Sequence, residues 1–340
     1  MRRVLIVGSG KRVREAALPV FLSARDKFEV TGVFSRTPKR ITAVGVEFEV
    51  AALEALDAQT LAATDLIYMV VAKDAVPAVL RRIVQHDVSR VDMLIETPVL
   101  RFRLLGHLGL LDAFRNTWVS EDCTTLPFFE TVAAFLAHTA SPPLERVIFD
   151  RAAYAYHGLA MGSALLGGER VTRGRRVRIS GGARRTVSFG PDRELVVIEP
   201  RDYARGHITL EGPGGNISDD PASPAPHQLR TVAEDGACVG FRVDDTTTHL
   251  NAAERALMGA PLAEGGVMTW MDGMKRVGFL RLLQAIAAGR GAHPLDRAVE
   301  DTVVDYQLEK FGRYVSTPLT NPYSPLARLS MRALTRLTGG

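Results

Sequence analysis

The stretch Val4-Leu5-Ile6-Val7-Gly8-Ser9-Gly10 decides how this chain folds. An aliphatic run that breaks into two close glycines is typical of a strand that turns tightly into a helix. The pattern stays helical to Phe21, and Phe28–Phe34 follows as a second apolar strand. In such a βαβ unit the pyrophosphate of a dinucleotide rests on the unpaired N–H groups of the helix N-terminus. The residues that we expect at this dinucleotide site are Gly8, Ser9, Gly10, Lys11 and Arg12.

The end of the second strand indicates which dinucleotide is bound. An acidic residue usually stands there when the ribose carries a free hydroxyl. Here Ser35, Arg36 and Thr37 stand at that point, followed by Lys39 and Arg40. Cations and hydroxyls suit a 2′-phosphate, so we expect NADP(H) in preference to NAD(H).

Two features of this segment leave an alternative open. Val13 occupies the place of the third glycine of the usual fingerprint, which implies looser packing of the helix on the strand. Two-glycine turns also occur in proteins that bind no nucleotide. The basic residues then form a solvated loop, an interpretation that fits Arg40 better than Arg36.

Composition bounds the class of protein. The 340 residues predict two domains, and 46% hydrophobic with 24% charged residues is ordinary for a globular chain. A net charge of +4 with interspersed acidic residues argues against a nucleic-acid partner. Cys123 and Cys238 match no metal motif and no disulfide framework, so we expect a cytoplasmic protein without a metal site. We expect no secretory leader, and no apolar run approaches the roughly 18 residues that span a membrane.

The N-terminal part alternates short apolar runs with helical patterns, which predicts an α/β domain with a doubly wound parallel sheet of Rossmann type over residues 1–121. The strands that we expect are Val4–Val7, Phe28–Phe34, Asp65–Val71, Val91–Ile95 and Thr117–Ser120. The helices that we expect after the first are Ala51–Ala63, Ala75–Gln85 and Phe102–Phe114.

Residues 122–315 predict an α+β domain with an open, largely antiparallel sheet. The expected order begins with a helix at Leu126–His138, a strand at Leu144–Ala155 and a Gly-rich helix at His157–Leu166. Six strand-like stretches and two late helices, Phe279–Ala288 and Ala298–Phe311, follow. Residues 316–340 form a tail with a short basic amphipathic helix that we expect to dock on the protein or on a second copy.

Several short segments stand in a characteristic order and spacing: Gly8-Ser9-Gly10, Ser35-Arg36, Glu96-Thr97-Pro98, Tyr156-His157-Gly158, Thr209–Gly215 and Phe279–Ile286. In this order and spacing the chain resembles the Gfo/Idh/MocA family of NAD(P)-dependent oxidoreductases, whose two-domain members are glucose-fructose oxidoreductase-like. The resemblance implies a Rossmann domain followed by a substrate domain, whose open sheet commonly forms the subunit interface. We therefore expect a homodimer or homotetramer through that sheet and a small-molecule substrate.

The resemblance also implies catalytic groups, and two of them are replaced. Thr97 stands where the family's Glu-Lys-Pro tripeptide has a lysine. The run Ala153–His157 keeps the histidine of the family's Asp-x-Gly-x-His motif but not its aspartate. A histidine often found on the helix after the fourth strand is also absent, with Pro77 near that place. The expected catalytic residues are His157, Tyr156, Tyr154 and Thr97, and the expected cofactor residues include Lys73, Glu96 and Pro98.

Residue chemistry refines the expected roles. His157 has the intrinsic pKa to exchange a proton near neutrality. Tyr154 and Tyr156, expected as strand neighbours at i and i+2, should point the same way. Lys73 directly follows a strand, so it can reach a cleft at the carboxyl end of the sheet.

Without the usual lysine, a developing alkoxide is less favoured. We therefore expect a biosynthetic reductase of a C=N or C=O bond in a small polar metabolite. Two alternatives remain open: a dinucleotide-binding sensor or assembly protein without turnover, and a non-redox enzyme with tightly bound cofactor.

Overall fold

Two compact units make up the described part of the chain. The computed structural model describes residues 1–168, 170–318, 320 and 329. The first domain consists of Met1–Glu121 together with Phe279–Thr302, and the second consists of Asp122–Gly278 together with Val303–Thr320. The expected second domain, residues 122–315, is therefore interrupted, because Phe279–Thr302 returns to the first domain.

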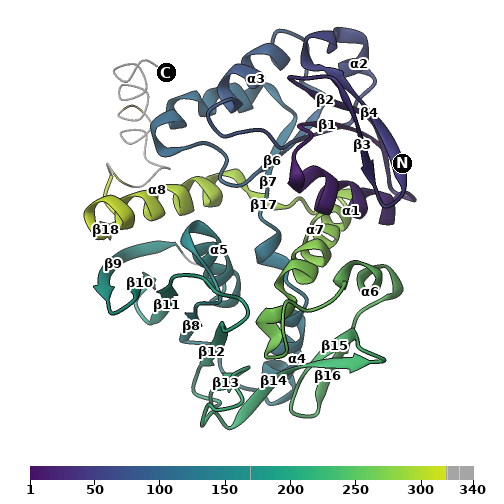
Figure 1. The fold of residues 1–340 in the computed structure, drawn as a ribbon. Helices are drawn as coiled ribbons and strands as arrows, with labels where there is room; N and C mark the ends of the chain where they lie inside the picture. Colours follow the sequence, from purple (N-terminus) through teal and green to yellow (C-terminus); the bar gives the residue numbers. More distant parts are fainter. Residues whose placement is uncertain (169, 319, 321–328, 330–340) are drawn as a thin grey trace. The chain divides into compact units, whose positions relative to one another are not determined.

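An eight-stranded sheet organises the first domain (Figure 1). Its strands are β1 (Arg2–Val7), β2 (Phe28–Ser35), β3 (Lys39–Ala43), β4 (Val46–Ala52), β5 (Leu66–Met69), β6 (Asp92–Glu96), β7 (Asn116–Ser120) and β17 (His293–Pro294). Its helical segments are η1 (Val13–Ala17), α1 (Leu18–Ser23), η2 (Leu53–Ala55), α2 (Ala58–Ala62), α3 (Val76–Ile83) and η3 (Phe102–Ala113).

The strand order places the topological switch point of the sheet between β1 and β5. The order is β17-β7-β6-β5-β1-β2-β4-β3, and only β3 and β17 run antiparallel to their neighbours. The chain passes from β1 to β2 on one side and later returns to β5 on the other. Ligands of open α/β sheets bind at such a switch point, outside the carboxyl ends of the strands. The doubly wound fold expected from the sequence is confirmed.

An aromatic cluster forms part of the core of this domain. Phe21 of α1 and Tyr68 of β5 are fully buried, and their ring centroids lie 5.8 Å apart. Phe279, from the returning segment, lies 5.7 Å from Phe21 and 5.2 Å from Tyr68. The return of Phe279–Thr302 therefore completes the hydrophobic core of the first domain.

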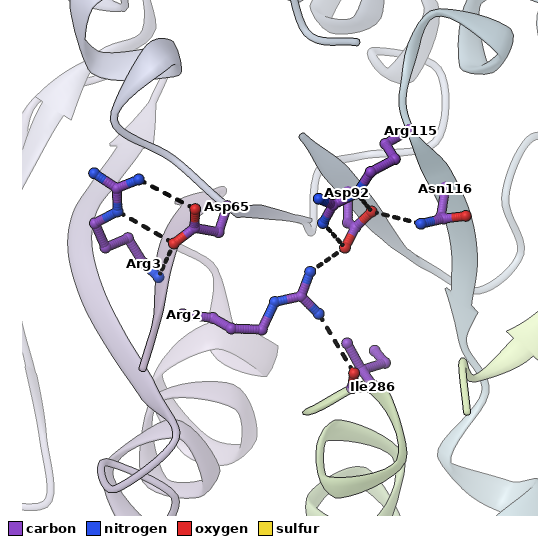
Figure 2. Close-up of polar contacts among 7 residues, drawn as sticks. All are labelled: Arg2, Arg3, Asp65, Asp92, Arg115, Asn116 and Ile286. Atoms are coloured by element: carbon purple, nitrogen blue, oxygen red, sulfur yellow. Dashed lines mark hydrogen bonds and ion pairs between the residues drawn. The ribbon is translucent and has the colours of Figure 1, made fainter. Parts of the chain in front are cut away.

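The amino ends of the strands are joined by an ion cluster on the edge opposite the crevice. Figure 2 shows Asp92, at the start of β6, accepting hydrogen bonds from Arg115, Asn116 and Arg2. The Arg115 Nη2 atom lies 2.6 Å and the Asn116 Nδ2 atom 2.9 Å from the Asp92 carboxylate. Burial alone raises the pKa of Asp92, but these hydrogen bonds together outweigh it and hold the pKa below its ordinary value.

Two expected helices of this domain differ in the structure. The segment Ala51–Ala63 is not one helix: β4 covers its start, and only η2 and α2 are helical. The preceding residues, Val46-Glu47-Phe48-Glu49-Val50, alternate apolar and charged side chains with the period of a strand. They pair with β3 as an antiparallel hairpin. The expected helix Phe102–Phe114 is the 3₁₀ segment η3.

A ten-stranded sheet organises the second domain, in the order β16-β15-β14-β13-β12-β8-β11-β10-β9-β18. Its strands are β8 (Arg146–Asp150), β9 (Val171–Ile179), β10 (Gly182–Phe189), β11 (Arg193–Glu199), β12 (His207–Glu211), β13 (Ile217–Ser218), β14 (His227–Glu234), β15 (Ala237–Val243), β16 (Thr246–His249) and β18 (Arg313–Val315). Only the pairs β8·β11 and β13·β14 are parallel, which confirms the expected, largely antiparallel sheet.

The helical segments around this sheet are η4 (Asp122–Thr125), α4 (Phe128–His138), α5 (Ala155–Leu165), α6 (Ala252–Met258) and η5 (Val267–Trp270). The helices α7 (Met271–Ala287) and α8 (Leu295–Phe311) each belong partly to both domains. α5 is rich in glycine because it packs closely on β11: a Cβ on Gly162 would lie 2.8 Å from Leu195.

Two remaining expectations concern the second domain and the tail. The expected strand Leu144–Ala155 is shorter in the structure, because β8 ends at Asp150 and α5 begins at Ala155. The expected helix of the tail falls outside the described residues apart from Leu329. Within the described ranges, no helix combines the length and the apolar character needed to cross a bilayer.

Candidate functional site

The two glycines after β1 differ in whether their surroundings leave space for a side chain. Gly8 has a φ of +129°, and a Cβ there would lie 1.9 Å from the main-chain oxygen of Val70, so the close approach of two strand ends requires glycine. Its N–H donates to the main-chain oxygen of Phe34 at 2.7 Å. A Cβ on Gly10, in contrast, would meet no atom within 4 Å. The space above Gly10 is therefore open to a ligand.

The helical segment after Gly10 begins at Lys11 and contains the π turn η1. Val13 is fully buried where the third glycine of the fingerprint usually stands. Pro19 follows and cannot donate the hydrogen bond that a regular helix would make there. Lys11 extends into solvent and lies 3.6 Å from Glu15, away from the pocket described next.

A pocket of about 660 Å³ extends from this turn along the carboxyl ends of β1, β2 and β5. Six residues expected to bind a cofactor line it: Gly8, Ser9, Gly10, Ser35, Arg36 and Thr37. The other lining residues are Val7, Lys39, Leu53, Glu54, Val70, Val71, Ala72, Ala75, Ala78, Val79 and Arg82. The pocket therefore lies at the switch point of the sheet, where the topology places ligands of this fold.

The charges on the pocket wall are mostly positive. Arg36 and Lys39 are exposed, and neither has an ion-pair partner among the residues that the structure describes. Arg82 donates to the main-chain oxygens of Leu53 at 3.1 Å and Glu54 at 2.7 Å. Glu54 contributes the single carboxylate among the described lining residues.

Some features of this wall could not be found in the sequence. Arg82 and Glu54 come from separate elements, α3 and η2, and no local pattern indicates that they meet beside β2. Ser35 has an observed partner, since its Oγ donates to the main-chain oxygen of Thr37 at 2.8 Å. That bond shapes the turn after β2 and leaves the lone pairs of the Ser35 hydroxyl as acceptors.

A second group of expected residues gathers around Glu96 at the end of β6. The Glu96 carboxylate accepts hydrogen bonds from the Tyr68 hydroxyl and from Arg12 Nε, the latter at 3.3 Å. Lys73 Nζ donates to the main-chain oxygen of Glu96 at 2.6 Å. Thr97 is buried and joined to Pro98 by a cis peptide bond. The structure thus brings Arg12, Lys73 and Glu96 together.

The ionisable groups around Glu96 are perturbed by burial. Burial raises the pKa of Tyr68 well above its ordinary value, and the negative charge of Glu96 acts in the same direction. Burial also lowers the pKa of Lys73 to about 8, although Glu96 opposes this shift. Strongly perturbed ionisable groups are typical of functional sites, and these two meet at Glu96, the last residue of β6.

The second domain holds the other expected catalytic residues as a ring cluster. Tyr154, Tyr156 and His157 lie at the start of α5, with ring centroids 4.3 to 6.2 Å apart. The expectation of strand neighbours was wrong, because Tyr156 is already helical, yet the rings still gather. The Arg201 guanidinium lies 5.1 Å from the ring of Tyr154.

Tyr203 extends this cluster and was not indicated by the sequence. Arg201 lies 5.0 Å and Lys275 Nζ 5.7 Å from the centre of the Tyr203 ring. These residues come from the loop after β11 and from α7, so only the fold brings them to α5. The cluster combines cations with hydroxyl-bearing rings, which suits recognition of a polar molecule.

Comparison with known proteins identifies the first domain. Residues 2–104 match the GFO_IDH_MocA family model, described as an oxidoreductase family with an NAD-binding Rossmann fold. No curated protein matches the sequence significantly. This match agrees with the family resemblance expected from the sequence, and it covers residues of the first domain.

Solved structures share the fold across both domains. A putative myo-inositol dehydrogenase from Sinorhizobium meliloti is 12% identical with a TM-score of 0.60, over 93% of this chain and 100% of that one. An aldose-aldose oxidoreductase from Caulobacter crescentus, complexed with glycerol, is 11% identical with a TM-score of 0.60, covering 93% and 99%.

An inositol dehydrogenase homolog from Azotobacter vinelandii, complexed with NADH and myo-inositol, is 12% identical with a TM-score of 0.55, covering 93% and 97%. At these identities the similarity establishes the two-domain fold and leaves the substrate open.

Proposed function

We propose that this member of an NAD-binding oxidoreductase family is an NADP(H)-dependent reductase of a C=O or C=N bond in a small polar metabolite. The observation that carries the coenzyme preference is the positive wall of the pocket at the end of β2. Arg36, Lys39 and Arg82 line it, and no acidic residue ends the strand. A 2′-phosphate placed there would gain charge-assisted hydrogen bonds that a ribose hydroxyl cannot form as strongly.

The residues of the chain would divide the work of the reaction. Bound coenzyme supplies the hydride, and the protein supplies orientation and electrostatics. Backbone N–H groups after Gly8 and Gly10 hold the pyrophosphate. Thr97 hydrogen-bonds the nicotinamide amide or the substrate, and His157 in the second domain exchanges a proton with the substrate. Tyr154 and Tyr156 orient the substrate.

The coenzyme preference is tested by fluorescence titration of the apoprotein with NADPH and NADH. We expect NADPH to bind more tightly, and Arg36→Ala to weaken NADPH binding about 10- to 100-fold, since a hydrogen bond to a charged group contributes about 1.5–3 kcal/mol. NADH affinity should stay unchanged. Arg40→Ala is the matched control, because Arg40 pairs with Glu47 at 3.4 Å and does not line the pocket. Equal affinities for the two coenzymes would contradict the proposal.

The reaction is tested with NADPH that carries deuterium at the transferable position. The panel should hold ketones, imines and, in the oxidising direction with NADP⁺, myo-inositol. Transfer of label to a ketone or imine, lost in His157→Ala, is the expected result. Tight binding without any transfer would instead favour a sensor or assembly protein. Coenzyme that co-purifies and does not exchange would favour a non-redox enzyme.

The proposal extends to assembly. A homodimer or homotetramer through the ten-stranded sheet would cover backbone groups at an open sheet edge. Size-exclusion chromatography with light scattering should give a mass two or four times that of the chain.

A further inference from the structure

Lys73 lies just beyond β5, in the loop that leads to α3. Its Nζ donates to the main-chain oxygen of Glu96, the last residue of β6. Because β5 and β6 are adjacent parallel strands, the ammonium group joins the carboxyl ends of both.

This place in the sheet corresponds to one half of a bound dinucleotide. β2, whose end carries Ser35 and Arg36, lies on the other side of β1 from β5. If the adenosine half lies over β2, the nicotinamide half extends over β5 and β6. In that arrangement Lys73 would lie near the reacting end of the coenzyme.

The charge of Lys73 is not neutralised by a direct ion pair. The Glu96 carboxylate is occupied by Arg12 and Tyr68, and Lys73 forms no ion pair with any residue that the structure describes. An ammonium group has three N–H donors, and Glu96 takes one through its main-chain oxygen. Two donors and a positive charge therefore remain at the edge of the sheet.

The surroundings make this charge unusual for a lysine. Lys73 is half-buried, and burial together with Arg12 lowers its pKa to about 8 against the opposing effect of Glu96. The residue that follows β6, Thr97, is buried and neutral. The ammonium group of Lys73 thus donates to the peptide that joins Glu96 to Thr97.

We propose that the Lys73 ammonium donates a hydrogen bond to the substrate atom that gains negative charge during hydride transfer. This inference rests on the proposed function. A fixed N⁺–H donor aimed at developing charge is an effective form of catalysis because it needs no reorganisation during the reaction. Lys73 would thereby supply a positive charge from the loop after β5, beside the neutral side chain of Thr97.

The test measures the pKa of Lys73 in the unmodified protein. The chain has six lysines, so protein labelled with [¹³Cε]lysine should give six resolvable signals in a pH titration. Lys73→Arg assigns the signal, and Lys73→Gln serves if the arginine variant does not fold. In the free protein we expect one signal to titrate near pH 8. Lys27 and Lys310 are exposed and serve as internal controls.

The decisive comparison is between the NADP⁺ and NADPH complexes. The oxidised ring is positive and the reduced ring is neutral, while the 2′-phosphate is common to both. If the nicotinamide ring lies about 6 Å from the ammonium group, its added positive charge should lower the pKa of Lys73 in the NADP⁺ complex by about 0.5–2 units relative to the NADPH complex. An identical pKa in both complexes would overturn the role of Lys73 while leaving coenzyme binding established. Failure of both coenzymes to bind would overturn the proposed function, and this inference with it.

Turnover supplies an independent readout once a substrate from the panel accepts label. Lys73→Met should lower kcat about 10²- to 10³-fold, the usual effect of removing one such donor. The KM for NADPH should hardly change, and wild-type activity should fall as pH rises through 8. Lys27→Met is the matched control, because Lys27 is exposed and precedes β2. A Lys73→Met enzyme with unchanged kcat would contradict the proposal.

Discussion

At the scale of single residues, Gly8 and Gly10 belong to one motif but differ in what surrounds them. The strand end at Val70 excludes a side chain at Gly8, whereas nothing in the protein excludes one at Gly10. A glycine that the protein itself does not require is explained by the close approach of a ligand. We therefore expect the glycine at position 8 to be needed for folding and the glycine at position 10 to be needed for binding.

Gly10→Ala and Gly8→Ala test this separation. We expect Gly10→Ala to leave the melting temperature of the apoprotein nearly unchanged and to weaken NADPH binding at least 10-fold. Gly8→Ala should lower the free energy of unfolding by about 3 kcal/mol or more, because it combines a disfavoured φ with a backbone clash. Thermal unfolding and fluorescence titration measure the two effects. Full NADPH affinity in Gly10→Ala would place the pyrophosphate elsewhere.

At the scale of elements, the two edges of the first sheet have separate tasks. The carboxyl ends of the strands carry the pocket and the Glu96 cluster. The amino ends carry the Asp92 cluster, in which side chains of β1, β6 and β7 and the preceding loop meet (Figure 2). Asp92 is 1% exposed, so its charge depends on these partners for stability.

Asp92→Asn should destabilise the protein in a pH-dependent way. At pH 7 we expect a loss of about 2–4 kcal/mol in the free energy of unfolding. The folded pKa of Asp92 is depressed, so its stabilisation is complete above the unfolded pKa and is lost as pH falls through the folded value. The difference between wild type and variant, measured by urea unfolding, should therefore narrow below about pH 4.

Asp65→Asn is the matched control at the same edge. The Arg3 guanidinium lies 3.1 Å from the Asp65 carboxylate. Both side chains are nevertheless more than a third exposed, 45% for Arg3 and 35% for Asp65. Water screens such a pair, so we expect a clearly smaller loss than for Asp92→Asn. Equal losses would mean that burial of Asp92 contributes nothing.

At the scale of the whole molecule, the first domain is completed by a distant part of the chain. Phe279, 158 residues beyond Glu121, packs on Phe21 and Tyr68. Tyr68 in turn holds Glu96, so the same contact supports both the core and the cluster around Lys73. Removal of the returning segment would expose aromatic surface that the domain buries.

A shortened chain and a full-length variant test this dependence. A fragment of residues 1–121 should lack a cooperative unfolding transition, whereas the full chain should show one. In the full chain, Phe279→Ala should lower the free energy of unfolding of the first domain by about 3–5 kcal/mol, as for other buried aromatic residues. Circular dichroism during urea unfolding measures both. A fragment that unfolds cooperatively and binds NADPH would show that the first 121 residues are sufficient.

Local patterns determined the elements whose signals lie within a few residues. The run Val4–Val7, the glycines after it and the basic turn at Ser35 and Arg36 predict the strand, the turn and the dinucleotide site, because each signal is a matter of adjacent residue types. The alternation of apolar and charged residues in Val46–Val50 is equally local. It predicts a strand that continues to Ala52, so a helix that begins at Ala51 conflicts with the adjacent residue pattern.

Tertiary structure alone decided which distant residues share a site. Arg82 meets Glu54, Lys73 reaches the main-chain oxygen of Glu96, and Phe279 returns to Tyr68, although no local pattern connects these pairs. The order of the strands in the sheet decides which distant residues come into contact. That order follows from the packing of whole elements against one another. The sequence by itself therefore determined the βαβ unit, its glycine turn and the basic turn after β2, while the place of Arg82 in the pocket wall, the Glu96 cluster and the interrupted second domain depended on long-range packing.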